Sequence, residues 1–269
     1  MKKKIIQQTF ISIAVFGAVF YCFSMVDWMR VFNYPSFSFE KLLGDLYEEY
    51  YLEKQEQVAD DTVTASLNTL LVHICEANDI DHSSIKLYCL KNEEVNAFAF
   101  PNRRVVVYSG LLTACEDETE LAGVMAHEIA HIEKGHIMRL LVKEIGFQIL
   151  LGQLLGKGGE IVTQTGKTIS SSAYDRSLER EADATAVAYL QKANITTTGI
   201  ANLFLRLAKE ENNVFYTAWI STHPDSKERA QTIQKLSENI EINYQKMLSD
   251  EQWQKIKDFA CIRFFQIPE

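Results

Sequence analysis

The chain has 269 residues, of which 47% are hydrophobic and 23% charged, and this composition excludes wholesale disorder and a collagen-like chain. The net charge of −9 argues against nucleic acid as a partner, because proteins that bind a phosphate backbone are usually basic. Only four prolines and twelve glycines are present, which favours long helices.

The N-terminal segment predicts a membrane anchor. Three lysines at 2–4 precede an uncharged stretch over 5–26, which as a helix would span about 33 Å against ~30 Å of bilayer hydrocarbon. Because the lysines lie on one side only, we expect a single-pass protein with the rest of the chain outside the cytosol. A cleaved signal peptide, which would give a secreted protein, and lipid attachment at Cys22 are the alternatives.

Behind this segment the pattern predicts helices, then a small sheet, then helices again. Residues 37–78 are expected to be helical, with a solvated acidic linker helix before Asp61 and a core helix over 66–76. Strands are expected over 85–90, 95–100 and 104–108. After Asp117 the pattern is helical, with a loop or mobile lid over 152–172.

The predicted fold class is therefore α+β and mainly helical, with a small antiparallel sheet and one N-terminal transmembrane helix. We divide the chain into an anchor or signal segment over 1–28, a helical linker over 29–60 and a folded domain over 61–269.

Two further patterns carry no chemistry. The cysteines behind the N-terminal segment lack metal-type spacing, so we interpret them as structural and leave their pairing open. They are Cys75, Cys89, Cys115 and Cys261. Gly166-Lys167-Thr168 is similar to the end of a phosphate-binding loop, but Ile161 stands where that pattern needs glycine, so we expect no nucleotide.

The stretch His127-Glu128-Ile129-Ala130-His131 is an HExxH pattern. Asp117 and Glu120 form a capping box that predicts a helix start just before it. Positions i and i+4 share a helix face, so both histidines can reach one Zn²⁺, and Glu128 lies beside the metal to take a proton from bound water. The apolar surroundings predict a buried helix, which argues against two unremarkable surface histidines.

A zinc site needs a third ligand, and two patterns compete for it. An extended motif would need glycine at 134 and histidine at 137, but Gly135 and His136 are each displaced by one residue. The alternative is a carboxylate from a second helix, and without the HExxH pattern its acidic stretch would be read as a solvated charge run. Glu179 and Asp183 share a face of that helix. We predict Glu179 as the ligand, with Glu181 as its competitor, and Asp183 as the group that orients a ligand histidine.

With these residues in place, the sequence resembles the HtpX-like and CAAX-prenyl-protease-like family of zinc metallopeptidases, within the gluzincins. The chain also resembles the quality-control members of this family, of the BepA and Oma types. The resemblance runs over about 95–236 and rests on the stretches 96–101, 107–112, 127–131, 176–183 and 221–224, with His136 and Arg229. One departure is Asn102-Arg103-Arg104, where many members have a glycine pair.

The resemblance implies a zincin-like domain with one Zn²⁺ per chain, held by His127, His131 and Glu179. In the family, a histidine at the position of His136 is not a ligand. His223, which precedes Pro224, would lie near the metal and either stabilise an oxyanion or occupy the fourth zinc position. The alternative interpretation of His223 is a loop histidine that caps the next helix.

The hypothesis for function is a membrane-anchored zinc endopeptidase that hydrolyses unfolded or damaged envelope proteins. An extended substrate would pair its backbone with an edge strand containing Asn96, Ala97, Phe98 and Ala99. One rival hypothesis is a zinc-binding periplasmic chaperone or assembly factor with a latent protease site. Another is a membrane adaptor in which the HExxH pattern is incidental.

Overall fold

The computed structural model describes residues 37–50, 52–141, 174–210, 213–238, 240 and 242–261. The chain from Glu40 onward forms one compact unit. Among the described helices, none combines the length and the apolar character that a membrane span requires. The predicted anchor over 5–26, Cys22 and the predicted loop over 152–172 lie outside the described residues, so these stay predictions.

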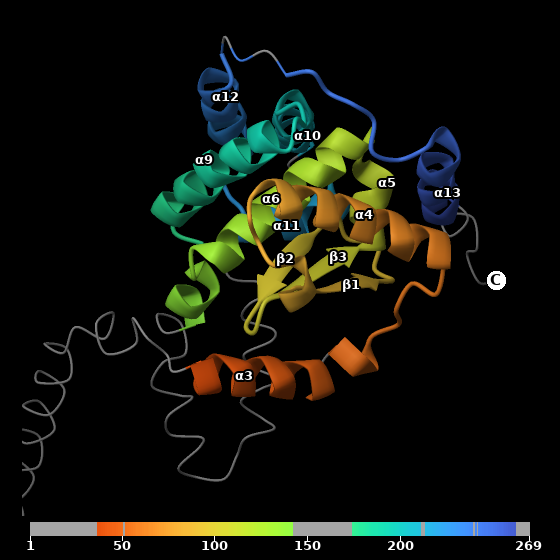
Figure 1. Ribbon diagram of the computed structural model, residues 1–269, viewed down its shortest axis with the longest axis vertical. Coiled ribbons are helices and arrows are strands. Elements are labelled where there is room, and N and C mark those ends of the chain that lie inside the picture. The colour runs from red at the N-terminus through yellow and green to blue at the C-terminus, as the bar shows by residue number, and fades with distance from the viewer. Residues whose placement is uncertain are drawn as a thin grey trace, which may run out of the picture. The chain divides into compact units, whose positions relative to one another are not determined.

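The described part of the chain is mainly helical with one small sheet, as the sequence predicts (Figure 1). Its α-helices are α3 (Phe37–Tyr50), α4 (Asp61–Ala77), α5 (Ser109–Ala114), α6 (Glu118–Glu133), α9 (Arg176–Lys192), α10 (Thr198–Lys209), α11 (Thr217–Thr222), α12 (Ser226–Leu236) and α13 (Asp250–Cys261). Short 3₁₀ turns η1 (Leu52–Lys54), η2 (His82–Ser84) and η3 (Val214–Tyr216) join some of them.

The described sheet has the strand order β1-β3-β2, with β1 at Lys86–Leu90, β2 at Ala97–Phe100 and β3 at Arg104–Tyr108. β2 and β3 form an antiparallel hairpin, but β1 runs parallel to β3. The prediction of a wholly antiparallel sheet is therefore wrong. The reason is the connection after β1, which carries the chain past the position that β3 later fills. β3 thus inserts between the two earlier strands and leaves β2 at an edge.

The β2–β3 turn explains the departure from the glycine pair. Asn102 and Arg103 both have positive φ, 59° and 56°, in the left-handed region that glycine adopts most easily. Arg103 is held there by an ion pair with Glu133 at 2.6 Å and by a hydrogen bond that its Nε donates to Ser84 Oγ at 2.7 Å. These contacts tie the turn to the end of α6 and offset the local backbone strain.

Helix α3 differs from the solvated helix that the acidic sequence predicts. Leu43 and Tyr47 are buried, and the Tyr47 ring lies 3.9 Å from the ring of Phe100, centroid to centroid. At Gly44 an added Cβ would lie 2.6 Å from the carbonyl oxygen of Pro101, so glycine permits the close approach of α3 to the β2–β3 turn.

The acidic residues of α3 have a basic partner in the sheet. Arg104, at the start of β3, is fully buried and forms ion pairs with Asp45 at 2.9 Å and with Glu48. Tyr88 and Lys86 of β1 also donate hydrogen bonds to Glu48. A charge run appears solvated when its partner lies far away in the sequence, which is why the prediction failed here.

Helix α6 begins where the capping pattern predicts. The Asp117 carboxylate accepts hydrogen bonds from the backbone N–H groups of Thr119 and Glu120, at 2.8 and 3.1 Å. Glu120 accepts from the backbone N–H of Glu116 and pairs with Arg206 of α10. Every residue of α6 up to Ile132 is buried, because the helix packs against α9, α10 and β2 (Figure 1). The sequence prediction of a buried helix is confirmed.

Candidate metal centre

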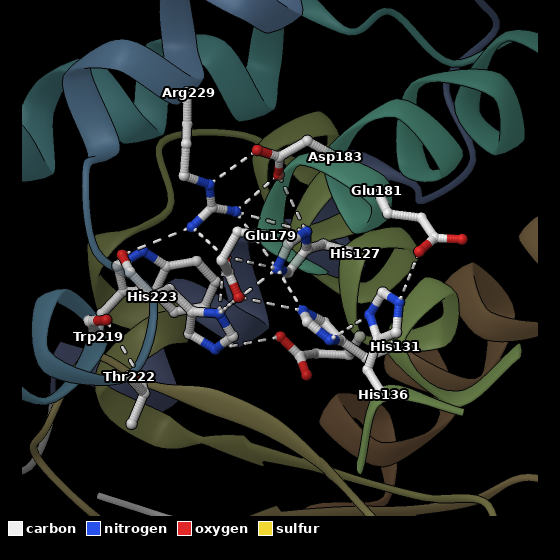
Figure 2. Close-up of polar contacts among 11 residues, drawn as sticks. His127, His131, His136, Glu179, Glu181, Asp183, Trp219, Thr222, His223 and Arg229 are labelled. Carbon is white, nitrogen blue, oxygen red and sulfur yellow. Dashed lines mark hydrogen bonds and ion pairs between the residues drawn. The ribbon is translucent and has the colours of Figure 1, made fainter. Parts of the chain in front are cut away.

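Four buried side chains converge at the contact between α6, α9 and the end of α11 (Figure 2). They are His127, His131, Glu179 and His223, and one potential ligand atom from each lies within 4.8 Å of the others. The Nε2 atoms of His127 and His131 are 3.0 Å apart. Glu179 Oε1 lies 3.4 Å from His131 Nε2, and its Oε2 lies 3.5 Å from His127 Nε2. His223 Nδ1 lies 3.1 Å from Glu179 Oε1.

Helix α9 delivers the carboxylate of this cluster from its first turn. The small residues Ala182 and Ala186 are buried and allow α9 to lie close along α6. Glu179 projects into the cluster, whereas the side chain of Glu181 is 42% exposed and lies outside it. The structure thus brings Glu179 rather than its competitor to the HExxH histidines.

His127 is supported on its far side by a buried ion-pair network. Its Nδ1 lies 3.1 Å from Asp183 Oδ1. Arg229 of α12 donates to both oxygens of Asp183, at 2.8 and 2.6 Å, and pairs with Glu179 Oε2 at 2.6 Å. Arg229 also stacks over the Phe204 ring, 4.4 Å from its centroid. Asp183 therefore stands where the sequence predicts, and Arg229 connects it to Glu179.

His131 is supported differently. Its Nδ1 lies 3.1 Å from the Nδ1 of His136, and the Nε2 of His136 lies 3.3 Å from Glu181 Oε2. The Tyr174 ring stacks on the His131 ring, with centroids 4.0 Å apart. His136 reaches this position because Gly135, with φ of 65°, ends α6 and turns the chain. This turn explains why the glycine and histidine after the motif do not supply a third ligand.

Glu128 and His223 face each other across the cluster. Glu128 is fully buried, and neither carboxylate oxygen has a hydrogen-bond partner among the described residues. Its Oε1 lies 3.6 Å from His223 Nε2. The His223 ring stacks on Trp219, with centroids 4.3 Å apart. Both predicted catalytic residues thus lie at the cluster, and His223 is not a loop residue that caps a helix through its side chain.

The profile of peptidase family M48 matches residues 61–237, which is most of the described chain. The chain belongs to peptidase family M48. The resemblance inferred from the sequence motifs is confirmed, because the same stretch contains the HExxH pattern, Glu179 and His223.

Several curated proteins are similar to this M48 chain. A putative beta-barrel assembly-enhancing protease of Vibrio cholerae is 30% identical over 71% of this chain and 44% of its own length. The metalloprotease LoiP of Escherichia coli is 29% identical over 58% of this chain and 64% of its own. The mitochondrial metalloendopeptidase OMA1 of Schizosaccharomyces pombe is 26% identical over 81% of this chain and 68% of its own length. The chain spans less than half the length of the beta-barrel assembly-enhancing protease from V. cholerae.

Burial and charge set the protonation of the M48 site. Burial raises the pKa of Glu128. Burial also acts to raise the pKa of Asp183, but Arg229 outweighs it and lowers that pKa to about 2, and the same guanidinium holds the pKa of Glu179 well below its usual range. Burial and the neighbouring His127 lower the pKa of His131 well below its ordinary value. His131 is therefore neutral, the form that offers a lone pair to a metal.

The donor set fits zinc. Two imidazole nitrogens and one carboxylate are the ligands of catalytic zinc sites that keep one position open. Three buried carboxyl groups, of Glu128, Glu179 and Asp183, lie near one buried guanidinium, Arg229, which pairs with the last two. Burial and Arg229 lower the pKa of His127, but hydrogen bonds with Asp183 and Glu179 outweigh them and raise it to about 9, so a divalent cation would replace the positive charge that a proton on His127 supplies. The unpartnered oxygens of Glu128 are a further sign of an absent polar partner. His127, His131 and Glu179 are the residues that would hold it.

The predicted substrate strand is one of the two edge strands of the described sheet. In the ladder with β3, the carbonyl of Asn96 accepts from the N–H of Tyr108, so the alternation directs the backbone groups of Ala97 and Ala99 away from β3. Both residues are fully buried in the structure. The side-chain oxygen and nitrogen of Asn96 are buried without a partner among the described residues. On the same edge, Val95 N–H donates to the Phe215 carbonyl at 2.8 Å, so η3 covers one end.

Three residues at the site gained no role from the sequence alone. Arg229 was part of the family resemblance only, and a single arginine in an amphipathic helix gives no sign of burial. Tyr174 lies just before α9 and Trp219 lies in a short helix, so neither has a periodic pattern around it. One signal could have identified Arg229. If Glu179 and Asp183 of α9 face the core, they require a buried cation, and Arg229 is a candidate for it.

Proposed function

We propose that this M48 chain is a zinc-dependent endopeptidase. The observation that carries the proposal is Glu128, a buried carboxylate with no hydrogen-bond partner among the described residues, beside His127, His131 and Glu179. Zinc bound there would supply Lewis-acid polarisation of the scissile carbonyl and an acidified water. Glu128 would accept a proton at its carboxylate and later return it to the leaving amine, a role that its raised pKa supports.

His223 has two candidate tasks in this proposal. Its Nε2 lies 3.6 Å from Glu128 Oε1, so a reacting carbonyl bound beside Glu128 would lie within reach of a ring N–H, which would stabilise developing negative charge. His223 also belongs to the group that could hold a metal, and its Nδ1 lies 3.4 Å from His127 Nε2 and 3.1 Å from Glu179 Oε1. Occupation of the fourth position by His223 would leave the site latent, which supports the second candidate function, a zinc-binding chaperone or assembly factor.

The proposed substrate is an unfolded polypeptide, bound extended along the edge of β2 that faces away from β3. Ala97 and Ala99 are buried there, so substrate binding would require this edge to become accessible. Backbone pairing at Ala97 and Ala99 would recognise main chain rather than side chains, which suits loose sequence preference. With Glu128→Gln, which should bind without cleaving, we expect an unfolded peptide to slow hydrogen exchange at these two amides. Protection elsewhere, with none at Ala97 and Ala99, would place the substrate away from β2.

The proposed setting is protein quality control at an extracytoplasmic membrane face. The uncharged stretch over 5–26 and the lysines before it support a single-pass anchor. The names of the relatives, which include beta-barrel assembly-enhancing proteases, support substrates among envelope proteins. Protease added to intact cells after removal of any outer barrier should degrade the part after residue 28. Protection of that part would place the domain in the cytosol.

The deciding experiment compares the 269-residue chain with Glu128→Gln in cleavage of an unfolded model protein. We expect cleavage by the wild type and a loss of at least about a hundredfold in the variant. Zinc should remain bound at one per chain in both, because Glu128 is not among the proposed ligands. Zinc binding without cleavage by either would instead favour the latent chaperone, and His223→Ala should then release activity if His223 holds the site shut.

A further inference from the structure

The two HExxH histidines have unlike supports behind them (Figure 2). His127 meets a buried carboxylate directly, at 3.1 Å between Nδ1 and Asp183 Oδ1. Among the described residues, no carboxylate contacts the Nδ1 of His131. It meets the Nδ1 of His136 instead, at 3.1 Å, and only then does a carboxylate follow, with Glu181 Oε2 3.3 Å from His136 Nε2.

The contacts among His131, His136 and Glu181 determine which ring nitrogen of each histidine carries the proton. His131 presents Nε2 to Glu179 and His127, so a metal in the cluster would take Nε2 and leave the proton of His131 on Nδ1. Two facing Nδ1 atoms at 3.1 Å require one donor and one acceptor, so the Nδ1 of His136 accepts. The proton of neutral His136 then lies on Nε2, where it is donated to Glu181.

We propose that Glu181 is a positioning residue for the metal: through His136 it fixes the ring orientation and the tautomer of His131. This inference rests on the proposed zinc peptidase function and adds residues to it. Helix α9 would then supply the ligand Glu179 and, on its two flanks, the carboxylates that orient both histidines. A carboxylate behind a ligand imidazole raises its basicity and holds its ring, and its loss typically weakens metal binding by about 10–100-fold.

The burial of His136 supports this role. The side chain is fully buried, and both ring nitrogens have partners, one inside the site and one at its surface. Gly135 adds nothing by packing, since no atom lies within 4 Å of a Cβ built there. Its positive φ is what turns His136 back toward His131.

The competing explanation is that Glu181 only joins surface elements. Lys134 and Arg139 lie 3.7 and 3.8 Å from its carboxylate, so Glu181 also has two cationic neighbours. Exposed pairs of this kind contribute little to stability, and neither of these cations touches a histidine in the cluster. They therefore offer matched controls. Lys134→Gln and Arg139→Gln remove the ion pairs but leave the hydrogen bonds from Glu181 through His136 to His131 intact.

The test measures zinc affinity of the 269-residue chain by competition with a chromogenic chelator. We expect Glu181→Ala to bind zinc about tenfold more weakly, and Glu181→Gln to stay within about twofold of wild type because its amide oxygen still accepts. Lys134→Gln and Arg139→Gln should bind like wild type. Equal unfolding midpoints of the metal-free forms would show that the fold is intact.

A double variant separates positioning from packing. His136→Asn keeps an acceptor near the position of Nδ1 but cannot reach Glu181, so Glu181→Ala should have no further effect in that background. Additive losses, or equal losses in Lys134→Gln and Arg139→Gln, would overturn the inference, as would full zinc affinity in Glu181→Ala. A wild-type chain that binds no zinc would instead overturn the proposed function, and the inference with it.

Discussion

Arg229 and Arg104 are both buried, but their carboxylate partners have very different surroundings. Arg229 pairs with Glu179 and Asp183, whose side chains are each 2% exposed. Arg104 pairs with Asp45, which is 50% exposed, and Glu48, which is 23% exposed. The first network has no access to water from either side, whereas water reaches the acidic half of the second.

The difference shows that the two arginines have different tasks: Arg229 acts on the candidate metal centre, and Arg104 attaches helix α3. The partners of Arg229 touch His127 and His131, so this guanidinium determines the charge and orientation of groups that would meet a metal. The partners of Arg104 belong to α3, on the far side of the sheet from α6 in Figure 1, and they touch none of the cluster. Each of the following predictions tests this separation.

The largest effect is expected for Arg229→Met. Removing the guanidinium leaves Glu179 and Asp183 buried without their cation, which typically costs about 3–5 kcal/mol of unfolding free energy. Urea unfolding of the metal-free chain would measure it. Zinc should recover part of the loss, because a bound cation replaces the missing charge. A cost no greater than that of Arg104→Met would show that the two networks do not differ.

A smaller effect is expected for Arg104→Met, about 1–3 kcal/mol, because Asp45 and Glu48 regain water when they lose the guanidinium. The loss should be local to α3 and appear as faster proteolysis within Phe37–Tyr50. Zinc affinity, measured by chelator competition, should stay at the wild-type value. Weaker zinc binding would mean that α3 and the site are coupled through the sheet.

The smallest effect is a dependence of stability on pH from Glu48. Partial burial alone would raise its pKa, but hydrogen bonds from Tyr88, Arg104 and Lys86 lower it to about 2 from an ordinary value of 4.5. The unfolded chain therefore takes up the proton first as the pH falls. The stabilisation is complete from about one pH unit above 4.5, decreases as the pH falls through 4.5 and disappears toward pH 2.

Paired unfolding curves of wild type and Glu48→Gln check this window. The difference in their unfolding free energies should be constant above about pH 5.5 and narrow steadily below 4.5. A difference that does not change between pH 6 and 3 would contradict the role assigned to Glu48.

The sequence predicted those parts of the fold that depend on local pattern. The strand Arg104–Tyr108 has the predicted bounds, and α6 begins after Asp117 because the Asp117 carboxylate accepts from the backbone N–H groups of Thr119 and Glu120. The HExxH spacing places both histidines on one face without help from tertiary structure. The roles of His127, His131 and Glu128 in binding and catalysis stay predictions.

What the sequence missed depends on partners that lie far along the chain. Arg104 buries acidic α3, and Arg229 neutralises α9, across separations that no local period reports. The parallel pairing of β1 depends on where the later strand β3 inserts. The helix face that Glu179 shares with Asp183 predicts Glu179 rather than Glu181 as the ligand. The packing of α9 against α6 then decides which of the two side chains reaches the histidines.

The division of the site among α6, α9 and α12 also sets an order of assembly during synthesis. A ribosome that has released α6 has made both HExxH histidines, but not Glu179, and Arg229 follows only with α12. Until α9 is made, the proposed site has two of its three ligands, and until α12 is made the carboxylates of α9 lack their partner Arg229. For a peptidase this order is a safeguard, since hydrolysis has to wait until nearly the whole domain exists.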